Sequence, residues 1–327
     1  MAKAIKSIAV LTSGGDSPGM NAAIRAVVRT AVFYEKTVYG VRRGYDGLIE
    51  GDLEELNAKS VKNILNLGGT LLKSARSEEF RTEEGQQKAY DQLQKHGIDA
   101  LVVIGGNGTF TGAHRFYERF DVPVIGIPGT IDNDLFGTDY TIGFDTATNT
   151  VVDCIDKIRD TASSHNRLFF VEVMGRDAGF IAMSTAVATG ALDVILPEEN
   201  KSYEDLFAEI ERGASRRKTS NIVVVAEGNK LGDSFEIAQT VRERFPEIDT
   251  KVTILGHLQR GGAPSCFDRV MASKLGVAAV EGLLNGKEDV MAGIVDDELT
   301  YTFLQQAVKN KAQLDPELLR ISKILAI

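Results

Sequence analysis

Three side chains that carry oxygen atoms follow one apolar segment at short spacing. Thr130, Asp132 and Asp134 come directly after residues 122–127, which predict a buried strand. Open α/β sheets bind ligands at the carboxyl ends of their strands, so catalytic residues are expected there. Of two carboxylates so closely spaced, one can accept a hydroxyl proton while the other orients a cation. The alternative is a simple Asx turn, and we favour the catalytic interpretation.

Two glycine-rich corners follow apolar segments in the same way. Residues 13–19 follow a predicted strand at 8–11, and residues 105–109 follow a predicted strand at 101–104. Such a corner aims free N–H groups and the positive end of a helix dipole at an anion, and phosphate is the natural ligand. Neither corner is a Walker A loop, and the second lacks the third glycine of the Rossmann pattern. Each could be a tight turn without a ligand, but two of them together favour phosphoryl transfer.

Basic side chains at segment ends are candidates for binding that phosphate. Arg76 carries a planar guanidinium group, although a lone arginine usually lies at the solvated surface. Arg176, His257 and Arg260 closely follow apolar segments in the second half of the chain. Anion binding explains this placement better than solubility does in a chain of net charge -9. The alternative for His257 is a packed ring bonded to the backbone.

Strands and helices must alternate to position these residues. Strands are predicted at residues 8–11, 101–104, 122–127, 168–173, 194–196, 222–226 and 252–255. Helices are predicted between them, for example at 21–33, 83–95, 148–161, 203–215, 235–244 and 268–284. The alternation predicts an α/β fold with mainly parallel sheets and right-handed crossovers. Strand-glycine-helix units occur in both halves. We therefore expect two similar Rossmann-like lobes with the active site in the cleft between them.

The composition limits the class of protein. A chain of 327 residues with 43% hydrophobic and 25% charged residues is typical of a globular protein with two domains or one large α/β unit. The net charge of -9 argues against a nucleic-acid surface and a polybasic membrane patch. Cys154 and Cys266 lack the spacing of a zinc site and fit a reducing compartment. No apolar run approaches the roughly 20 residues of a membrane span. The sequence predicts a cytoplasmic protein without membrane or nucleic-acid partners.

Five motifs occur in the order found in one known family. They are GGDSPGMNAAIR at residues 14–25, GGNG at 105–108, PGTIDND at 128–134, MGR at 174–176 and GHLQRGG at 256–262. Through them the chain resembles the bacterial ATP-dependent 6-phosphofructokinases over nearly its whole length. The resemblance implies a glycolytic enzyme that transfers the γ-phosphoryl group of ATP to the 1-hydroxyl of fructose 6-phosphate, with Mg²⁺ bridging the β- and γ-phosphates. It also implies a larger ATP-binding lobe, 1–142 plus about 259–309, and a smaller sugar-binding lobe, 143–258 plus about 310–327.

The resemblance further implies roles for individual residues. Asp132 is the expected general base, and the other expected catalytic residues are Thr130, Asp134, Arg76 and Arg176. The expected nucleotide contacts are Gly15, Arg76, Ser77, Gly106, Asn107, Gly108 and Thr109. The expected sugar-phosphate contacts are Thr130, Asp132, Asp134, Arg167, Met174, Gly175, Arg176, Glu227, Lys251, His257 and Arg260.

Assembly and regulation are also implied by the resemblance. In the family, the counterparts of Arg167 and Lys251 come from a neighbouring subunit, which implies a homotetramer with substrate sites that span an interface. The family's effector site, which binds ADP or phosphoenolpyruvate, is matched at Arg25, Arg29, Arg159, Arg216 and Lys218. Ala58 and Leu192 replace an arginine and a metal-linked glutamate of that site. A weak or absent response to both effectors is therefore expected.

Four positions bear on the donor, the metal and the sugar. Gly108 and Gly129 favour ATP, since pyrophosphate-using relatives carry aspartate and lysine there. Asn107 stands where the family usually has an aspartate linked to Mg²⁺, and its amide offers an oxygen without a charge. Lys251 replaces the usual arginine and lacks its bidentate fork. The alternatives are a pyrophosphate-dependent phosphofructokinase, a more distant kinase acting on a nucleotide or lipid, and a catalytically weak sugar-phosphate or nucleotide sensor, which Asn107 motivates.

Overall fold

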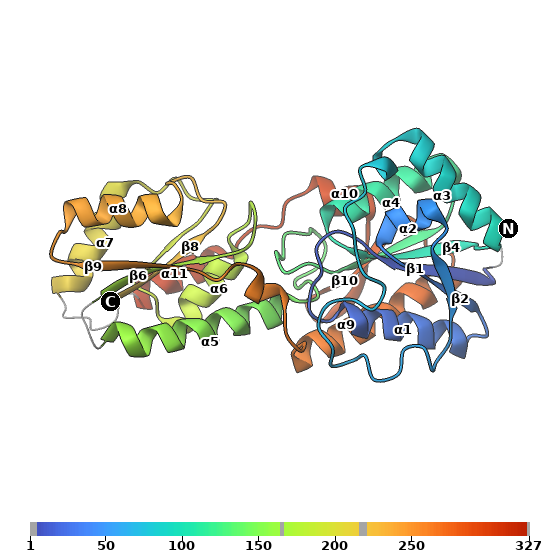
Figure 1. Cartoon of the computed structure of the whole chain (residues 1–327), viewed down its shortest axis with the longest axis horizontal. Helices are drawn as coiled ribbons and strands as arrows, with labels where there is room; N and C mark the ends of the chain where they lie inside the picture. The colour runs from blue at the N-terminus through green and yellow to red at the C-terminus, as the bar shows by residue number, and fades with distance from the viewer. Residues whose placement is uncertain (1–4, 164–166, 216–220, 326–327) are drawn as a thin grey trace. The chain divides into compact units, whose positions relative to one another are not determined.

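The computed structural model describes residues 5–163, 167–215 and 221–325 (Figure 1). The chain forms two compact units. Unit 1 comprises residues 1–130, 135–146 and 260–312, and unit 2 comprises 131–134, 147–259 and 313–327. The assignment of ATP and the sugar phosphate to two lobes with limits at 142, 258 and 309 stays a prediction.

Unit 1 is built on a seven-stranded sheet of order β11-β10-β5-β4-β1-β2-β3. The five inner strands are parallel, and β3 and β11 pair antiparallel at the two edges. The central strands β1, β4 and β5 are buried along their whole length, as expected for parallel strands covered on both faces. The bounds are β1 (Ser7–Thr12), β2 (Thr37–Val41), β3 (Leu53–Leu56), β4 (Ala100–Gly105), β5 (Val124–Pro128), β10 (Val290–Val295) and β11 (Glu298–Phe303).

Helices cover both faces of this sheet (Figure 1). On one face α1 (Met20–Phe33) packs with α9 (Cys266–Leu284), and their apolar side chains share a core with Ile8 and Val10 of β1. On the other face, Ala9 and Leu11 of β1 pack with the remaining helices. These are α2 (Gly44–Glu50), α3 (Glu83–His96), α4 (Asn107–Phe120) and α10 (Leu304–Lys309). The alternation of side chains along β1 therefore produces a three-layer unit.

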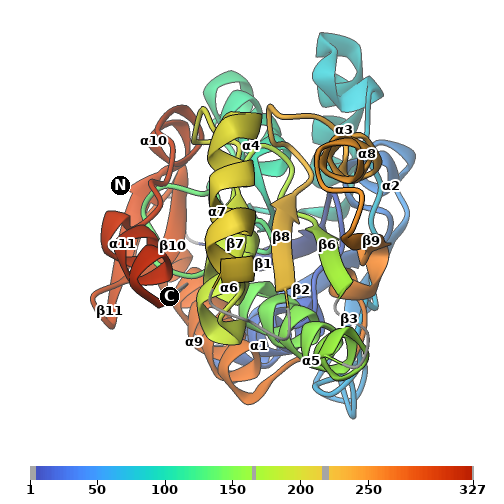
Figure 2. The ribbon, with the colours of Figure 1, turned by 90° about the vertical axis from the view of Figure 1, so that its left-hand side faces the viewer.

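Unit 2 contains a four-stranded parallel sheet of order β7-β8-β6-β9. Figure 2 shows α7 and α8 on one side of it and α5 and α6 on the other. The α7 and α8 side shares a core that includes Phe170 and Val223, and α11 packs against α6. The bounds are α5 (Phe144–Ser163), β6 (Arg167–Val173), α6 (Phe180–Thr189), β7 (Asp193–Ile195), α7 (Tyr203–Ser215), β8 (Asn221–Ala226), α8 (Ser234–Arg244), β9 (Asp249–Ile254) and α11 (Pro316–Leu325).

The predicted α/β class with mainly parallel sheets is confirmed. The two units share a layered design but differ in size, with seven strands in one sheet and four in the other. Two short 3-10 helices, η1 (Glu79–Arg81) and η2 (Gly256–Arg260), complete the described elements. Among the helices of the described residues, none is long and apolar enough to cross a membrane.

Candidate functional site

The loops that follow β1, β4 and β5 are bonded to one another in unit 1. The backbone N–H of Ser13 donates to the oxygen of Ile104 at 3.0 Å, and that of Gly129 donates to the oxygen of Gly105 at 3.0 Å. The hydroxyl of Thr109 donates to the oxygen of Ser13 at 3.1 Å. The three corners that the sequence singled out are therefore neighbours at one edge of the sheet, where open α/β sheets bind ligands.

The second glycine corner is the start of a helix. Gly106 is the N-cap of α4, and Asn107, Gly108 and Thr109 form its first turn. A helix leaves its first N–H groups without acceptors inside the helix, which makes this end a binding site for anions. A Cβ atom added at Gly108 would meet nothing within 4 Å, so the first turn is open at this residue. Phosphate oxygens could approach the backbone here.

Arg260 lies against the first glycine corner. Its Nη1 donates to the backbone oxygen of Asp16 at 3.0 Å, and both residues belong to unit 1. A Cβ atom added at Gly15 would lie 2.7 Å from the same Nη1. The sequence grouped Arg260 with the sugar-phosphate contacts, and the structure places it beside a predicted nucleotide loop.

The segment that carries Arg76 and Ser77 is held next to the same corner. Gly14 N–H donates to the oxygen of Ala75 at 3.2 Å, and the hydroxyl of Thr12 donates to the oxygen of Lys73 at 2.6 Å. Arg76 itself is exposed, while Ser77 Oγ accepts from the N–H of Phe80 at 3.1 Å. The exposed guanidinium at the end of an anchored segment is suited to an incoming anion.

The segment with the paired carboxylates follows β5 and is anchored at its start. Thr130 is 8% exposed, and its backbone oxygen accepts from the hydroxyl of Thr141 at 2.6 Å. Asn133 adopts a left-handed backbone conformation with φ of 54° and is buried. Asp132 and Asp134 on either side of it are partly exposed. The two aspartates therefore flank an ordered turn and are partly exposed, with Oδ1 of Asp132 buried.

In unit 2, the ends of β6, β8 and β9 bring together several predicted sugar contacts. The N–H of Arg176 donates to Oε1 of Glu227 at 2.7 Å, and the N–H of Met174 donates to Oε1 of Gln259 at 3.2 Å. Gly175 has a φ of 144°, which favours glycine. The exposed side chain of Arg176 thus extends from a loop whose backbone is bonded to Glu227, and the exposed side chain of His257 extends from η2.

Arg167 and Lys251 share one carboxylate. Oδ2 of Asp249 accepts from Nε of Arg167 at 2.9 Å, and Nζ of Lys251 lies 2.7 Å from Oδ1. The hydrogen bond from Lys251 and then that from Arg167 lower the pKa of the Asp249 carboxyl. The two predicted sugar-phosphate cations therefore lie side by side on neighbouring strands, and Asp249 partly neutralises them.

The predicted effector residues are spread over both units. Arg25 and Arg29 lie on α1, and Arg159 on α5 donates to the backbone oxygen of Thr189. Leu192, which replaces the metal-linked glutamate, is buried. Arg216 and Lys218 lie outside the described residues.

The oxygen-bearing residues of the two glycine corners fit a metal ion that a nucleotide holds with its phosphates. In the described part of the chain, no group of three or more His, Cys, Asp or Glu side chains could hold a metal ion. Mg²⁺ is commonly bound by one or two protein oxygens together with substrate phosphates. Asn107 and Asp16 belong to the two glycine corners that the bond from Thr109 to Ser13 joins, and both carry such oxygens.

Sequence reasoning missed several residues that support these loops. Tyr45 donates its hydroxyl to the oxygen of Thr109 at 2.7 Å and stacks on Phe80 with ring centroids 3.9 Å apart. Gln259 and Asp249 support the sugar side. Gln259 stands inside the GHLQRGG motif and could have been included with it, whereas no local pattern marks Tyr45 or Asp249.

Comparison with known proteins gives a consistent family. The family model described as Phosphofructokinase matches residues 7–283. The chain is 52% identical over 323 residues to ATP-dependent 6-phosphofructokinase 2 of Bacteroides thetaiotaomicron, covering 99% of both chains. It is 53% identical over 321 residues to ATP-dependent 6-phosphofructokinase of Cytophaga hutchinsonii, covering 98% of both. Among solved structures, phosphofructokinase from Saccharomyces cerevisiae has a TM-score of 0.89 and 38% identity, with 93% of this chain and 45% of the yeast chain covered.

Proposed function

Because this chain belongs to the phosphofructokinase family, we propose that it transfers the γ-phosphoryl group of ATP to the 1-hydroxyl of fructose 6-phosphate in glycolysis. The main structural support is the set of three backbone-bonded loops after β1, β4 and β5. They carry an anion-binding helix start and the paired carboxylates in the pattern that phosphoryl transfer needs.

We propose that the nucleotide binds to loops of unit 1. The N–H groups of Asn107, Gly108 and Thr109 at the start of α4 would donate to phosphate oxygens. Gly15 leaves the first corner without a side chain, and Gly106 provides a similar close approach to the backbone. The exposed guanidinium of Arg76, with Ser77 beside it, would bind the transferring group through a planar fork.

Asp132 is the proposed general base. Its carboxylate would take the proton from the 1-hydroxyl as this oxygen forms a bond to the γ-phosphorus and the bond between that phosphorus and the β-phosphate oxygen breaks. ADP then leaves. Thr130 and Asp134 flank the base and would orient the hydroxyl group, while Arg176 would offset the charge of the transferring group. The anchored turn around Asn133 fixes the carboxylates before substrate binds.

Mg²⁺ is the proposed cofactor. When bound, it would neutralise charge on the β- and γ-phosphates. The amide oxygen of Asn107 and the carboxylate of Asp16 are the residues of unit 1 that would hold it, directly or through water. Since an amide contributes no charge, we expect a higher Mg²⁺ requirement than an aspartate at position 107 would give.

Loops of unit 2 are proposed to bind the sugar phosphate. Met174, Gly175 and Arg176 would contact the sugar together with Glu227, and His257 would contact its phosphate group. Arg260, which belongs to unit 1, is a further proposed contact of that phosphate group. Arg167 and Lys251 would act from a neighbouring subunit of a homotetramer. Their position on adjacent strands, joined by Asp249, provides paired cations for a phosphate.

We also propose that effectors regulate this protein only weakly and that it is located in the cytoplasm. The substitutions at Ala58 and Leu192 are expected to weaken binding of ADP and phosphoenolpyruvate to the site of Arg25, Arg29, Arg159, Arg216 and Lys218. The cytoplasm stays the predicted location.

A coupled assay with one acceptor and two donors tests the proposed function. Fructose 6-phosphate is supplied with either ATP or pyrophosphate while Mg²⁺ is varied, and formation of fructose 1,6-bisphosphate is followed. We expect turnover with ATP only. Turnover with pyrophosphate would favour the pyrophosphate-dependent alternative, and binding of both substrates without turnover would favour the sensor.

A further inference from the structure

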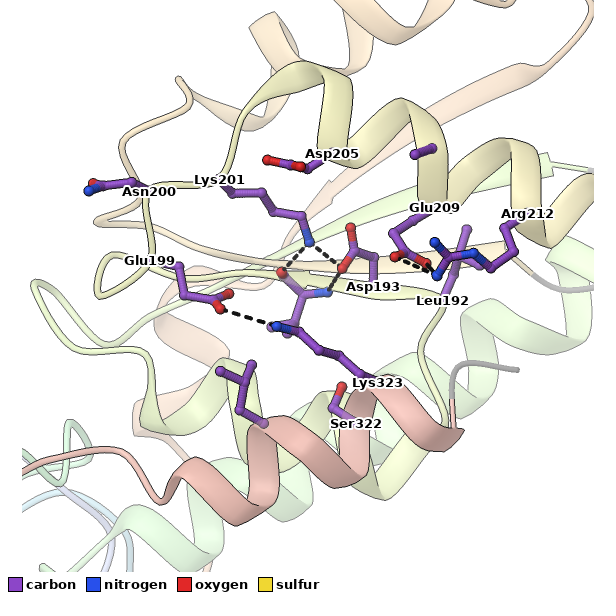
Figure 3. Close-up of a pocket in the computed structure, with 13 residues that line it drawn as sticks. Leu192, Asp193, Glu199, Asn200, Lys201, Asp205, Glu209, Arg212, Ser322 and Lys323 are labelled. Atoms are coloured by element: carbon purple, nitrogen blue, oxygen red, sulfur yellow. Dashed lines mark hydrogen bonds and ion pairs between the residues drawn. The ribbon is translucent and has the colours of Figure 1, made fainter.

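Unit 2 contains a pocket of about 450 Å³ apart from the loops described above (Figure 3). Its walls come from β7, from residues 199–201, from α7 and from α11. None of the residues predicted to contact the nucleotide or the sugar phosphate lines it. Leu192, a replaced position of the predicted effector site, contributes to its apolar lining together with Leu319.

A buried carboxylate with one unsatisfied oxygen lies in this pocket. The side chains of Asp193 and Lys201 are only 10% and 13% exposed. Oδ1 of Asp193 accepts from Nζ of Lys201 and from the N–H of Val194, the latter at 2.8 Å. Oδ2 has no hydrogen-bond partner among the described residues. Burial raises the pKa of the Asp193 carboxyl, and the ion pair with Lys201 opposes that rise and favours the ionised form. A buried carboxylate oxygen without a donor costs free energy, so the site is suited to a ligand that supplies one.

The pocket also carries an excess of negative charge. Four of its lining residues are acidic and three are basic. Figure 3 shows the basic side chains already engaged, Arg212 with Glu209 at 2.8 Å and Lys323 with Glu199 at 3.7 Å. Asp205 instead accepts from the N–H and the hydroxyl of Ser202, at 3.0 and 2.7 Å. These bonds lower the pKa of the Asp205 carboxyl, which keeps it ionised.

These features define the ligand by its chemistry. A donor would satisfy Oδ2, and a positive charge would offset the one excess acidic residue of the lining. A metal ion is disfavoured because no group of three suitable ligands exists in the described residues. An ammonium group supplies both. We propose that this pocket binds a small organic compound with a primary ammonium group, whose N–H donates to Oδ2 of Asp193 and whose charge balances that of Asp205. The apolar side chains of Leu192 and Leu319 would contact its carbon skeleton.

Calorimetric titration of the full chain tests the proposal with simple probes. Ethanolamine carries one primary ammonium group and 1,4-diaminobutane carries two, and tetramethylammonium has the single charge of ethanolamine without an N–H donor. We expect the first two to bind with one site per chain and tetramethylammonium to bind at least about tenfold more weakly, because a hydrogen bond to a charged group is lost. Equal binding of all three, or no binding of either amine, would overturn the proposal and leave a pocket filled with water.

Variants locate the binding at Asp193. Asp193→Asn removes the charge and turns a donor toward the ligand, so amine binding should fall by about tenfold or more. Because this change leaves Lys201 buried without its counter-ion, the variant Asp193→Leu/Lys201→Leu replaces the whole pair with apolar groups, an exchange that proteins often tolerate. The matched control is Asp153→Asn, which removes an exposed carboxylate from α5. Unchanged amine affinity in the folded double variant, or an equal loss in the control, would contradict the assignment.

Discussion

Arg260 donates a hydrogen bond from Nη1 to the backbone oxygen of Asp16 across 3.0 Å. This bond ties Arg260, the first residue of the GHLQRGG segment that belongs to unit 1, to the first glycine corner of the same unit. It depends on the absence of a side chain at Gly15, since a Cβ atom there would lie 2.7 Å from the same Nη1. The position of Arg260, a predicted sugar contact, therefore depends on the residue at position 15, a predicted nucleotide contact.

Gly15→Ala should displace the Arg260 guanidinium and break its bond to Asp16. We expect Gly15→Ala and Arg260→Ala each to raise the KM for ATP several-fold. The KM for ATP of the double variant should be little higher than that of the more affected single variant, because each change breaks the same bond from Arg260 to Asp16. Steady-state kinetics of the four proteins measure this coupling. Fully additive effects would show that the two residues act independently.

The sequence predicted β1, β4 and β5 of the unit 1 sheet and all four strands of the unit 2 sheet, but it named neither β2 and β10 nor the edge strands β3 and β11. Segments 8–11 and 101–104 became β1 and β4 because a parallel strand covered on both faces is continuously apolar. β11 pairs antiparallel at an edge and has an exposed or half-exposed pattern, so its apolar signal is weak. The second glycine corner, where the sequence predicted a helix end facing an anion, is the start of α4 at Asn107, although no bounds were predicted for that helix.

Sequence motifs marked the loops of the candidate site, whereas Tyr45 and Asp249, which support these loops through tertiary contacts, carry no motif. The three glycine and aspartate corners are local patterns, and the structure joins them through Ser13 and Gly129. Asp249 supports Arg167 from 82 residues away, across the β6 and β9 pairing, and no spacing in the sequence marks that relation.

Asn107→Asp should reduce the Mg²⁺ concentration needed for half-maximal activity by about tenfold or more. A unit charge about 4 Å from the ion is worth roughly 4 kcal/mol at an effective dielectric near 20, before desolvation is subtracted. Activity is measured against free Mg²⁺ at fixed ATP, with Asn107→Ala as the variant that loses the oxygen and should need more metal. If Asn107→Asp gave no gain at limiting Mg²⁺, position 107 would not contribute to metal binding.

The two donor-selecting glycines should respond differently to substitution. A Cβ atom added at Gly108 would meet no atom within 4 Å. A Cβ atom added at Gly129 would lie 2.9 Å from Cγ2 of Ile104 and 3.1 Å from Cε of Met20. Gly108→Asp should leave the unfolding free energy within about 0.5 kcal/mol and raise the KM for ATP several-fold, through repulsion of the phosphates. Gly129→Lys should cost about 1–3 kcal/mol by overpacking.

Chemical denaturation and ATP kinetics check both glycine variants, and Gly108→Ala is the uncharged control. A normal KM for ATP in Gly108→Asp would show that the nucleotide phosphates do not approach the start of α4.

Asp249→Asn should lower the KM for fructose 6-phosphate a few-fold. The neutral amide no longer competes with the sugar phosphate for Arg167 and Lys251, and the gain should shrink as salt is added. The control is Asp153→Asn, which frees Lys157 on the exposed face of α5 and should change nothing. A KM that does not move would argue that the two cations do not contact the sugar phosphate.

The most direct test of the whole account is the turnover of Asp132→Asn, which keeps the shape of the side chain and removes its ability to take a proton. With saturating ATP, fructose 6-phosphate and Mg²⁺, we predict that kcat falls by about 10²–10⁴-fold while the KM for ATP stays near that of the unchanged protein. A kcat equal to that of the unchanged protein would show that another group removes the proton, and the assignment of Asp132 as the base would be wrong.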